Sequence, residues 1–315
     1  MFIVGCDRSG TTLLRLMLDQ SPQLHIPEES GFLTSLDERR KDYGDFSEPR
    51  QRWFFVRDLQ ANKSTDSSFT FPIFGLASDE AEEAVRAAAP TTLAGAAAAL
   101  FSASARKKGK SRWGDKTPCH VLDVARLASD FPEAQFIHVI RDGRDVAASM
   151  IKAGWTLDAR TAARLWKTRV EAGRAAGAAL GAGRYREVRF EALVARPEDA
   201  LRQLCLWVDI DYTPSMLRYY ETAESRIVPQ HAQFHRLLSR PPDASRALAW
   251  PRDLPRREVA DFEAAAGELL ATLGYPLTGL RIHAALKGAR GFAKTVTPAF
   301  LRAASLLRRL GVCFG

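Results

Sequence analysis

The chain has 315 residues, 46% of them hydrophobic, so it can bury a large core and is most simply read as one large domain with insertions. Its net charge is +8, but residues 281–315 contain seven basic residues and no acidic ones, which leaves the first 280 residues almost neutral. This distribution disfavours nucleic-acid binding, which requires a basic surface on the main domain.

The cysteines and the apolar runs further limit the possible classes of protein. Four scattered cysteines form no CxxC pair, so the spacing typical of a zinc site is absent. A strand pattern begins at residue 2, which leaves no room for a signal peptide, and no run of about 18 uninterrupted apolar residues occurs. We therefore expect a soluble, cytoplasmic protein.

The chain opens with a predicted strand, turn and helix, at residues 2–4, 5–10 and 11–20. Glycines at both ends of the turn permit a tight bend, and N–H groups at a helix N-terminus bind anions. Arg8 adds a guanidinium to the turn. The turn resembles a Walker A loop, but Thr11 and Thr12 stand where that motif has Lys followed by Ser or Thr. It therefore favours an anionic ester that needs no metal.

The later elements alternate between helices and strands. Residues 37–75 lack clean periodicity and read as a variable insertion, while the pattern predicts helices over 79–106, 121–129, 145–152, 161–180, 197–207 and 256–273, and strands over 135–140 and 186–190. Strands that alternate with helices of ten or more residues predict a parallel sheet with right-handed crossovers. The predicted fold class is therefore α/β.

A second candidate anion site follows the strand over 135–140. Arg141 stands at the carboxyl end of this strand, where α/β folds bind ligands, and Ser149 lies one or two turns into the next helix. The alternative is a salt-bridged Arg-Asp turn on the surface. Two anion loops at the carboxyl ends of strands indicate a nucleotide with phosphates at both ends.

Four segments resemble the PAPS-dependent sulfotransferases, where PAPS is 3′-phosphoadenosine-5′-phosphosulfate. They are GCDRSGTTLLRLML (5–18), HIPEESGFL (25–33), WGDKTP (113–118) and FIHVIRDGRDVAAS (136–149). The most similar branch is that of bacterial enzymes similar to tyrosylprotein sulfotransferases, and the resemblance covers most of residues 1–276. It implies a P-loop-NTPase-like three-layer fold with a central parallel sheet. The expected division is a sulfotransferase domain over 1–280, with an acceptor-shaping insertion at 37–108, and a basic extension over 281–315.

The resemblance also implies the reaction and its residues. A sulfuryl group moves from PAPS to a hydroxyl or amine by in-line displacement without a metal. The 5′-phosphosulfate is assigned to Arg8, Ser9, Gly10, Thr11 and Thr12, and the 3′-phosphate to Arg141 and Ser149. Lys116 resembles the lysine that reaches the transferring group, which suits a leaving phosphate that gains charge. Glu29 resembles the carboxylate base of the tyrosylprotein branch, and the alternative base is His120, which follows Lys116-Thr117 as in cytosolic sulfotransferases.

The sequence departs from the tyrosylprotein branch at two positions. Gly31 stands where that branch has an Arg two residues after its base, which weakens the expectation of an acidic peptide substrate. Ala249 stands where it has a Lys, and either Arg246 or Arg252 is a candidate replacement as a phosphate ligand. His138, inside a buried strand, is expected to be a core residue.

The basic extension and the acceptor leave alternatives open. Residues 301–310 form an amphipathic basic pattern typical of membrane-surface segments, and the alternative is a disordered extension. A tail of this kind would bring the enzyme to the inner membrane face. The acceptor is a small molecule, a lipid or glycan, or a peptide. Two rival functions are a nucleotide kinase with a degenerate loop and a non-catalytic, membrane-peripheral PAPS-binding protein.

Overall fold

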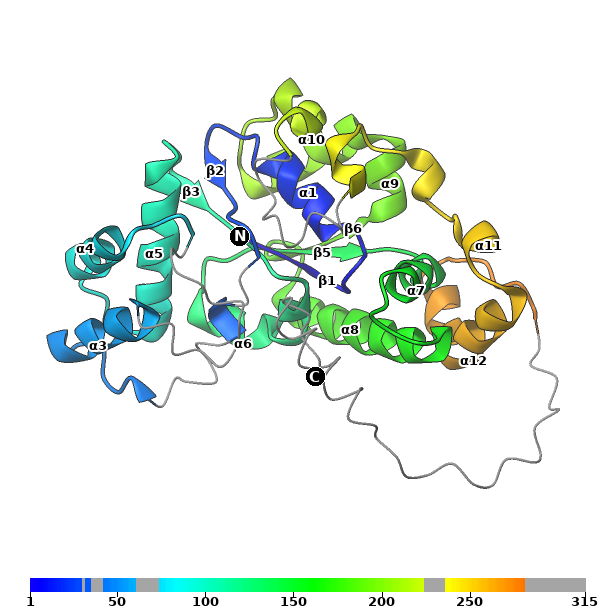
Figure 1. The fold of residues 1–315 in the computed structure, drawn as a ribbon, viewed down its shortest axis with the longest axis horizontal. Helices are drawn as coiled ribbons and strands as arrows, with labels where there is room; N and C mark the ends of the chain where they lie inside the picture. The colour runs from blue at the N-terminus through cyan, green and yellow to red at the C-terminus, as the bar shows by residue number, and fades with distance from the viewer. Residues whose placement is uncertain (30–31, 35–41, 61–73, 224–235, 281–315) are drawn as a thin grey trace.

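The fold is built around a four-stranded parallel sheet with strand order β4-β1-β5-β6. The structure, a computed structural model, describes residues 1–29, 32–34, 42–60, 74–223 and 236–280. Helices cover both faces of the sheet (Figure 1), with α1, α9 and α10 on one side and α6, α7 and α8 on the other. This arrangement confirms the predicted three-layer α/β fold.

The strands are short and the helices carry most of the described chain. The strands are β1 (Phe2–Gly5), β2 (Leu24–His25), β3 (Arg112–Trp113), β4 (Asp115–Lys116), β5 (Phe136–Ile140) and β6 (Tyr185–Arg189). The α-helices are α1 (Thr11–Leu18), α3 (Pro49–Gln60), α4 (Ser78–Ala88), α5 (Leu93–Lys107), α6 (Val124–Asp130), α7 (Gly143–Lys152), α8 (Ala159–Leu180), α9 (Phe190–Ala195), α10 (Pro197–Val208), α11 (Trp250–Asp253) and α12 (Arg256–Thr272). Short 3₁₀ helices are η2 (Pro118–Leu122), η3 (Pro214–Glu221), η6 (Arg236–Ser239) and η7 (Ala244–Arg246).

Strand β1 lies in the middle of the sheet and fixes where the loops meet. It pairs with β4 on one side, where Ile3 is opposite Lys116, and with β5 on the other, where Gly5 is opposite Val139. Because these strands are parallel, the turn after β1, Lys116 and Arg141 all emerge at the same edge of the sheet.

Alternation along β1 divides the core into two layers. Phe2 and Val4 pack into a cluster with α5 and α6, whereas Ile3 points to the opposite face and packs with α1, α9 and α10. Strand β5 is buried along its whole length, because helices cover both of its faces. This double burial accounts for the apolar run in the sequence. Trp113 also belongs to the core, as it stacks on Phe101 with ring centroids 4.7 Å apart.

The insertion is where the sequence-based expectations were wrong. A single helix was expected over 79–106, but α4 and α5 are separate, because Ala89 takes a positive φ of 42° directly before Pro90. Residues 37–75, which lack clean periodicity and were expected to be part of a helical or loop insertion, contain α3. In the described part of the chain, no helix is long and apolar enough to cross a membrane.

His138 on β5 makes the stability of the fold depend on pH. Its ring is fully buried and its Nδ1 lies 2.5 Å from the Tyr185 hydroxyl, which confirms it as a core residue. Burial lowers the pKa of His138 from 6.5 to about 3. Between these pH values the unfolded chain holds a proton that the folded protein does not, so stability falls as the pH drops.

We expect this histidine to lower the free energy of unfolding by about 2 kcal/mol between pH 7 and pH 5. Urea titrations at the two pH values measure the difference, and His138→Gln should flatten it. An equally steep dependence in the variant would show that another group is responsible.

Candidate active site

The turn between β1 and α1 has the backbone of an anion-binding loop. Gly10 has φ 98°, and a Cβ at this position would lie 2.4 Å from the Phe190 ring, so only glycine fits. Helix α1 begins at Thr11, and the N–H groups of its first turn have no acceptor within the helix. Ser9 is fully buried, and its hydroxyl has no partner among the residues that the structure describes. The backbone donors of this turn are available to an anion, whereas Ser9 does not line the cavity described below.

A buried ion pair fixes this turn to the helical layer beneath it. Asp7 pairs with Arg169 of α8, and the Arg169 side chain is fully buried. Burial also raises the pKa of the neighbouring Cys6 thiol to about 12, so this cysteine stays protonated. The turn is therefore anchored from the side opposite to the one that faces solvent.

Arg8 lies between the two predicted anion loops. It has φ 67°, its Nε donates to the Ser149 hydroxyl at 3.0 Å, and its guanidinium lies 5.1 Å from the centre of the Trp155 ring. The two sites were expected to be separate, one for each end of the ligand. In the structure the two sites adjoin each other, because Arg8 of the first loop contacts Ser149 of α7.

Arg141 is held in place by several contacts. Its guanidinium donates to the carbonyl oxygens of Arg8 at 3.2 Å and Arg246 at 2.7 Å, and it lies 4.3 Å from the centre of the Phe190 ring. Asp145 accepts a further bond at 3.3 Å. Burial lowers the pKa of Arg141, and Asp145 opposes that shift. The alternative of a surface Arg-Asp turn is wrong for Arg141, which is only 8% exposed.

Arg144 has a structural role. It forms the salt-bridged Arg-Asp turn that was the alternative interpretation of this segment. It is fully buried, pairs with Asp142 and Glu263, and lies 3.9 Å from the centre of the Trp250 ring. It thereby joins α7 to α11 and α12, and its charge is already neutralised by two carboxylates. Of the two arginines in this turn, Arg141 is the one that lines the cavity.

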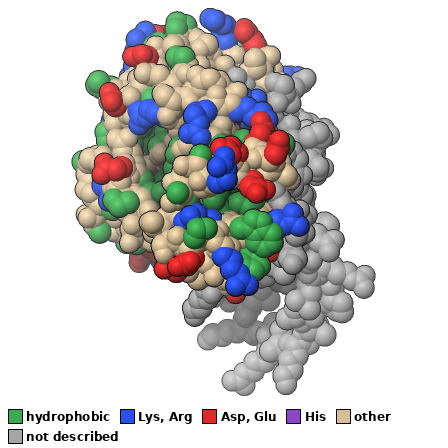
Figure 2. Space-filling model, turned by 90° about the vertical axis from the view of Figure 1, so that its left-hand side faces the viewer, with side chains coloured by type: hydrophobic (Ala, Val, Ile, Leu, Met, Phe, Trp, Pro, Cys, Tyr) green, Lys and Arg blue, Asp and Glu red, His purple; other side chains and the backbone are tan. Residues whose placement is uncertain are grey.

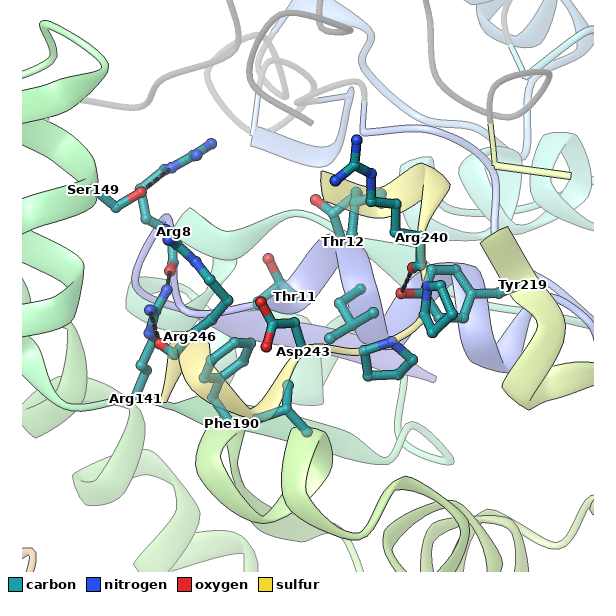
Figure 3. Close-up of a pocket in the computed structure, with 16 residues that line it drawn as sticks. Arg8, Thr11, Thr12, Arg141, Ser149, Phe190, Tyr219, Arg240, Asp243 and Arg246 are labelled. Carbon is teal, nitrogen blue, oxygen red and sulfur yellow. Dashed lines mark hydrogen bonds between the residues drawn. The ribbon is translucent and has the colours of Figure 1, made fainter. Parts of the chain in front are cut away.

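A cavity of about 230 Å³ lies over these loops. Its lining residues come from five parts of the chain: Arg8, Gly10, Thr11, Thr12, Leu13, Arg141, Ser149, Phe190, Val194, Tyr219, Leu238, Arg240, Pro241, Pro242, Asp243 and Arg246. In Figure 3, Arg8, Arg141, Arg246 and Ser149 gather on one side of the cavity, while Thr12, Arg240 and Tyr219 lie on the other. The cavity thus has a cationic end and a longer, partly apolar wall.

Lys116 and Glu29 form an ion pair in a different part of the same sheet edge. The Lys116 side chain is 3% exposed and that of Glu29 is 17% exposed. The pair forms because β2 and β3 align in parallel, with Leu24 opposite Arg112, so that the segments leading to the two residues run side by side. Neither residue lines the cavity over the loops.

The end of α1 holds the segment that carries Glu29. Asp19 accepts hydrogen bonds from the Ile26 backbone N–H at 2.9 Å and from His25 Nδ1 at 3.0 Å. Burial acts to raise the pKa of Asp19, but these bonds and the nearby Lys110 lower it to about 2, so Asp19 is ionised. Helix α1 therefore links the anion loop at its start to the candidate base beyond its end.

His120, the alternative base, is enclosed. The ring is fully buried, and its Nδ1 lies 2.9 Å from Asp115 Oδ1. Its Nε2 has no hydrogen-bond partner in the described ranges. A base has to reach the acceptor hydroxyl, so the partly exposed carboxylate of Glu29 is better placed than this ring.

Several cavity residues were not singled out from the sequence. Phe190 lies in the segment VRFEAL (188–193). Its position directly after β6 was a signal that could have identified it. Tyr219, Arg240 and Asp243 lie in segments without a recognisable pattern. Of the two arginines left open as phosphate ligands, Arg246 lines the cavity, whereas Arg252 does not line it and pairs with Asp253.

Comparison with known proteins agrees with this geometry. The model of the sulfotransferase family matches residues 1–214. The chain belongs to the sulfotransferase family. It is therefore a transferase that acts on sulfuryl groups. The match includes both loops, Glu29 and Lys116, and it lies within the predicted domain over 1–280, whose end at residue 280 stays a prediction.

Similar curated proteins include protein-tyrosine sulfotransferases. That of Drosophila melanogaster is 23% identical over 284 residues, which is 87% of this chain and 51% of the relative. Protein-tyrosine sulfotransferase A of Caenorhabditis elegans is 23% identical over 286 residues, 87% of this chain and 67% of the relative. The chain thus spans about half to two thirds of the length of these relatives.

Solved structures show the same fold. The sulfotransferase domain of the Synechococcus PCC 7002 olefin synthase is 24% identical, with a TM-score of 0.59, and the match covers 88% of this chain and 94% of that domain. The sulfotransferase domain of the curacin biosynthetic pathway is 20% identical, with a TM-score of 0.60, and covers 88% and 97%. Both support the P-loop-like fold.

Proposed function

We propose that this enzyme transfers the sulfuryl group of PAPS to a hydroxyl group of its acceptor. The observation that carries the donor assignment is the joined pair of anion loops, in which Arg8, Ser149 and Arg141 meet at the cationic end of one cavity. PAPS has anionic groups at its 3′ and 5′ positions, and guanidinium groups suit phosphates because they donate two parallel hydrogen bonds.

The chemistry of the cavity wall also suits the rest of a nucleotide. Besides the arginines, its wall includes the apolar side chains of Leu13, Phe190, Val194, Pro241 and Pro242. Flat apolar walls suit a nucleobase, whereas the backbone donors at Gly10 and Thr11 suit the 5′ anionic group. We therefore assign the 3′-phosphate to Arg141, Ser149 and Arg246, and the phosphosulfate to the turn from Arg8 to Thr12.

The ion pair of Glu29 and Lys116 supports the proposed chemical step. In the reaction, the Glu29 carboxylate takes the proton of the acceptor hydroxyl as the oxygen attacks sulfur. The bond between sulfur and the bridging oxygen breaks, and Lys116 stabilises the charge that develops on the leaving phosphate. The products are 3′-phosphoadenosine-5′-phosphate (PAP) and the sulfated acceptor, and no metal takes part.

A tyrosine of a peptide or protein is the acceptor that the curated relatives suggest. Gly31, where the tyrosylprotein branch has an arginine, lies outside the described residues, so the preference for acidic peptides stays open to experiment. The basic extension over 281–315 lies outside them as well, and we propose its contact with an anionic membrane only as a route to a lipid acceptor. Cytoplasmic location stays a prediction.

Binding of PAP and AMP, measured by calorimetry, tests the donor assignment. We expect PAP to bind more tightly than AMP, and Arg141→Ala to weaken PAP binding by at least about a hundredfold, since removal of one buried charged partner costs about 3 kcal/mol. AMP, which has no 3′-phosphate, should lose much less affinity. Arg246→Ala should weaken PAP binding more than Arg252→Ala, the matched control at an exposed position.

Equal binding of PAP and AMP by the unmodified protein would overturn the proposal, as would unchanged PAP affinity in Arg141→Ala. Tight, magnesium-dependent binding of ATP would instead revive the nucleotide kinase. PAP binding without turnover on any phenol, tyrosine peptide or alcohol would point to the non-catalytic alternative.

A further inference from the structure

Helices α3 and α4 lie at one end of the molecule (Figure 1), and neither contributes a residue to the cavity over the loops. They pack against each other, and each buries one face in the core. The buried residues are Phe55, Val56 and Leu59 of α3 and Ala81, Ala84 and Val85 of α4. The opposite faces are exposed, and Figure 2 shows this end of the molecule, where hydrophobic, basic and acidic side chains lie close together.

The outward stripe of α3 consists of Arg50, Trp53, Phe54 and Arg57, spaced i, i+3, i+4 and i+7. Trp53 is 49% exposed and Phe54 is 42% exposed, and their ring centroids are 5.2 Å apart. Arg50 lies 5.3 Å from the centre of the Phe54 ring and Arg57 lies 5.5 Å from that of Trp53. Tryptophan and arginine are the residues that dominate binding energy at protein interfaces.

The outward stripe of α4 has the same spacing and the opposite charge. It consists of Asp79, Glu82, Glu83 and Arg86, all exposed. Arg86 donates to Glu83 within the stripe, with Nε 2.9 Å from Oε2, so the stripe is negative overall. Two helices that pack against each other therefore expose a basic aromatic stripe and an acidic stripe.

We propose that the α3 and α4 stripes bind a second copy of this chain in a two-fold symmetric dimer. A two-fold interface uses the same surface on both copies, so the α3 stripe of each copy can face the α4 stripe of the other. Opposite charges then meet at both contacts between α3 and α4. The aromatic rings become buried from water near the centre of the interface. A surface in which one helix is basic and its neighbour acidic is complementary to itself.

The charge pattern also distinguishes this partner from a membrane. An anionic bilayer attracts a helix with exposed tryptophan and arginine, but it repels acidic side chains at the same depth. The α4 stripe contributes Asp79, Glu82 and Glu83 on the helix that packs against α3. The pattern therefore favours a protein surface of matching charge over lipid.

The size of the surface sets the expected strength. Helices of 12 and 11 residues extend about 18 Å. Two such helices side by side, each about 10 Å wide, give a footprint roughly half of the 800 Å² that each partner of a stable complex buries. We therefore expect a reversible dimer whose population rises with protein concentration.

Sedimentation velocity over a wide concentration range tests the dimer. The unmodified protein should shift from monomer to dimer, and the double variant Trp53→Ser/Phe54→Ser should stay monomeric. Leu206→Ser is the matched control, because Leu206 is 85% exposed on α10, outside the surface, and this variant should dimerise normally. Near-ultraviolet circular dichroism verifies that each variant is folded.

Exchanging charges between the stripes distinguishes a specific, charge-complementary interface from non-specific hydrophobic association. Arg50→Glu/Arg57→Glu makes both stripes acidic, and Glu82→Lys/Glu83→Lys makes both basic, so each variant alone should be monomeric. A mixture of the two should dimerise, since an acidic stripe then meets a basic one at both contacts. Monomers at every concentration of the unmodified protein, or in the mixture, would overturn the proposal. So would Trp53-dependent sedimentation of the monomer with phosphatidylserine vesicles.

Discussion

Replacing Glu29 with glutamine is expected to lower kcat for sulfuryl transfer by a factor of about 100 to 10,000. The amide keeps the size of the side chain but cannot accept the proton of the acceptor hydroxyl. The donor loops lie elsewhere on the sheet edge, so the affinity for PAP should not change. Single-turnover release of PAP, with the best acceptor from a screen of phenols and tyrosine peptides, measures the chemical step.

Two further variants make this result specific. Glu28→Gln alters the neighbouring carboxylate and should leave turnover close to normal. His120→Gln tests the other base, and its melting temperature has to be followed because His120 is fully buried next to Asp115. Full turnover in Glu29→Gln, together with loss of turnover in a folded His120→Gln, would reverse the assignment of the base.

The second large effect is expected at Arg169, where replacement by methionine should lower the free energy of unfolding by about 3–5 kcal/mol. The change leaves the Asp7 carboxylate without its buried partner in the turn that forms the anion loop. PAP affinity should fall as well, because the turn loses its anchor to α8. Urea titration measures the first effect and calorimetry the second.

A double variant and a control on the same helix support this reading. Asp7→Asn combined with Arg169→Met should cost less than the sum of the single changes, since no buried charge is left alone. Arg174→Met breaks a pair with Glu187 whose side chains are 39% and 29% exposed, so it should cost less than about 1 kcal/mol. Equal losses for Arg169→Met and Arg174→Met would contradict the special role of the buried pair.

The elements next to the cavity were the ones that the sequence predicted well. The strand before Arg141 and the helix after it are confirmed, because an apolar run followed by a polar turn and a periodic helix leaves few alternatives. The glycines around the first turn and the position of Arg141 at a strand end likewise follow from local rules. The sulfotransferase family was identified from the resemblance of four segments in their order along the chain, and the family match confirms it.

Contacts between distant segments were not predictable in the same way. The hydrogen bond from Arg8 to Ser149 joins residues 141 positions apart, and no local pattern encodes it. The two-residue strands β2 and β3 are too short to give a periodic signal, although they bring Glu29 and Lys116 together. Helix α3 was hidden because its exposed face carries Trp53 and Phe54, which blur the apolar stripe.

The strand order has a consequence for which donors the enzyme can use. Lys116 lies at the end of β4 and Arg141 follows β5, with β1 between them. Neighbouring strands lie about 4.8 Å apart, so the two cations start from backbone positions about 10 Å apart. Under the donor assignment proposed above, the sheet therefore sets the distance between the cation for the 5′ end and the cation for the 3′ end. A nucleotide with negative charge at one end alone would then contact only one of the two cations.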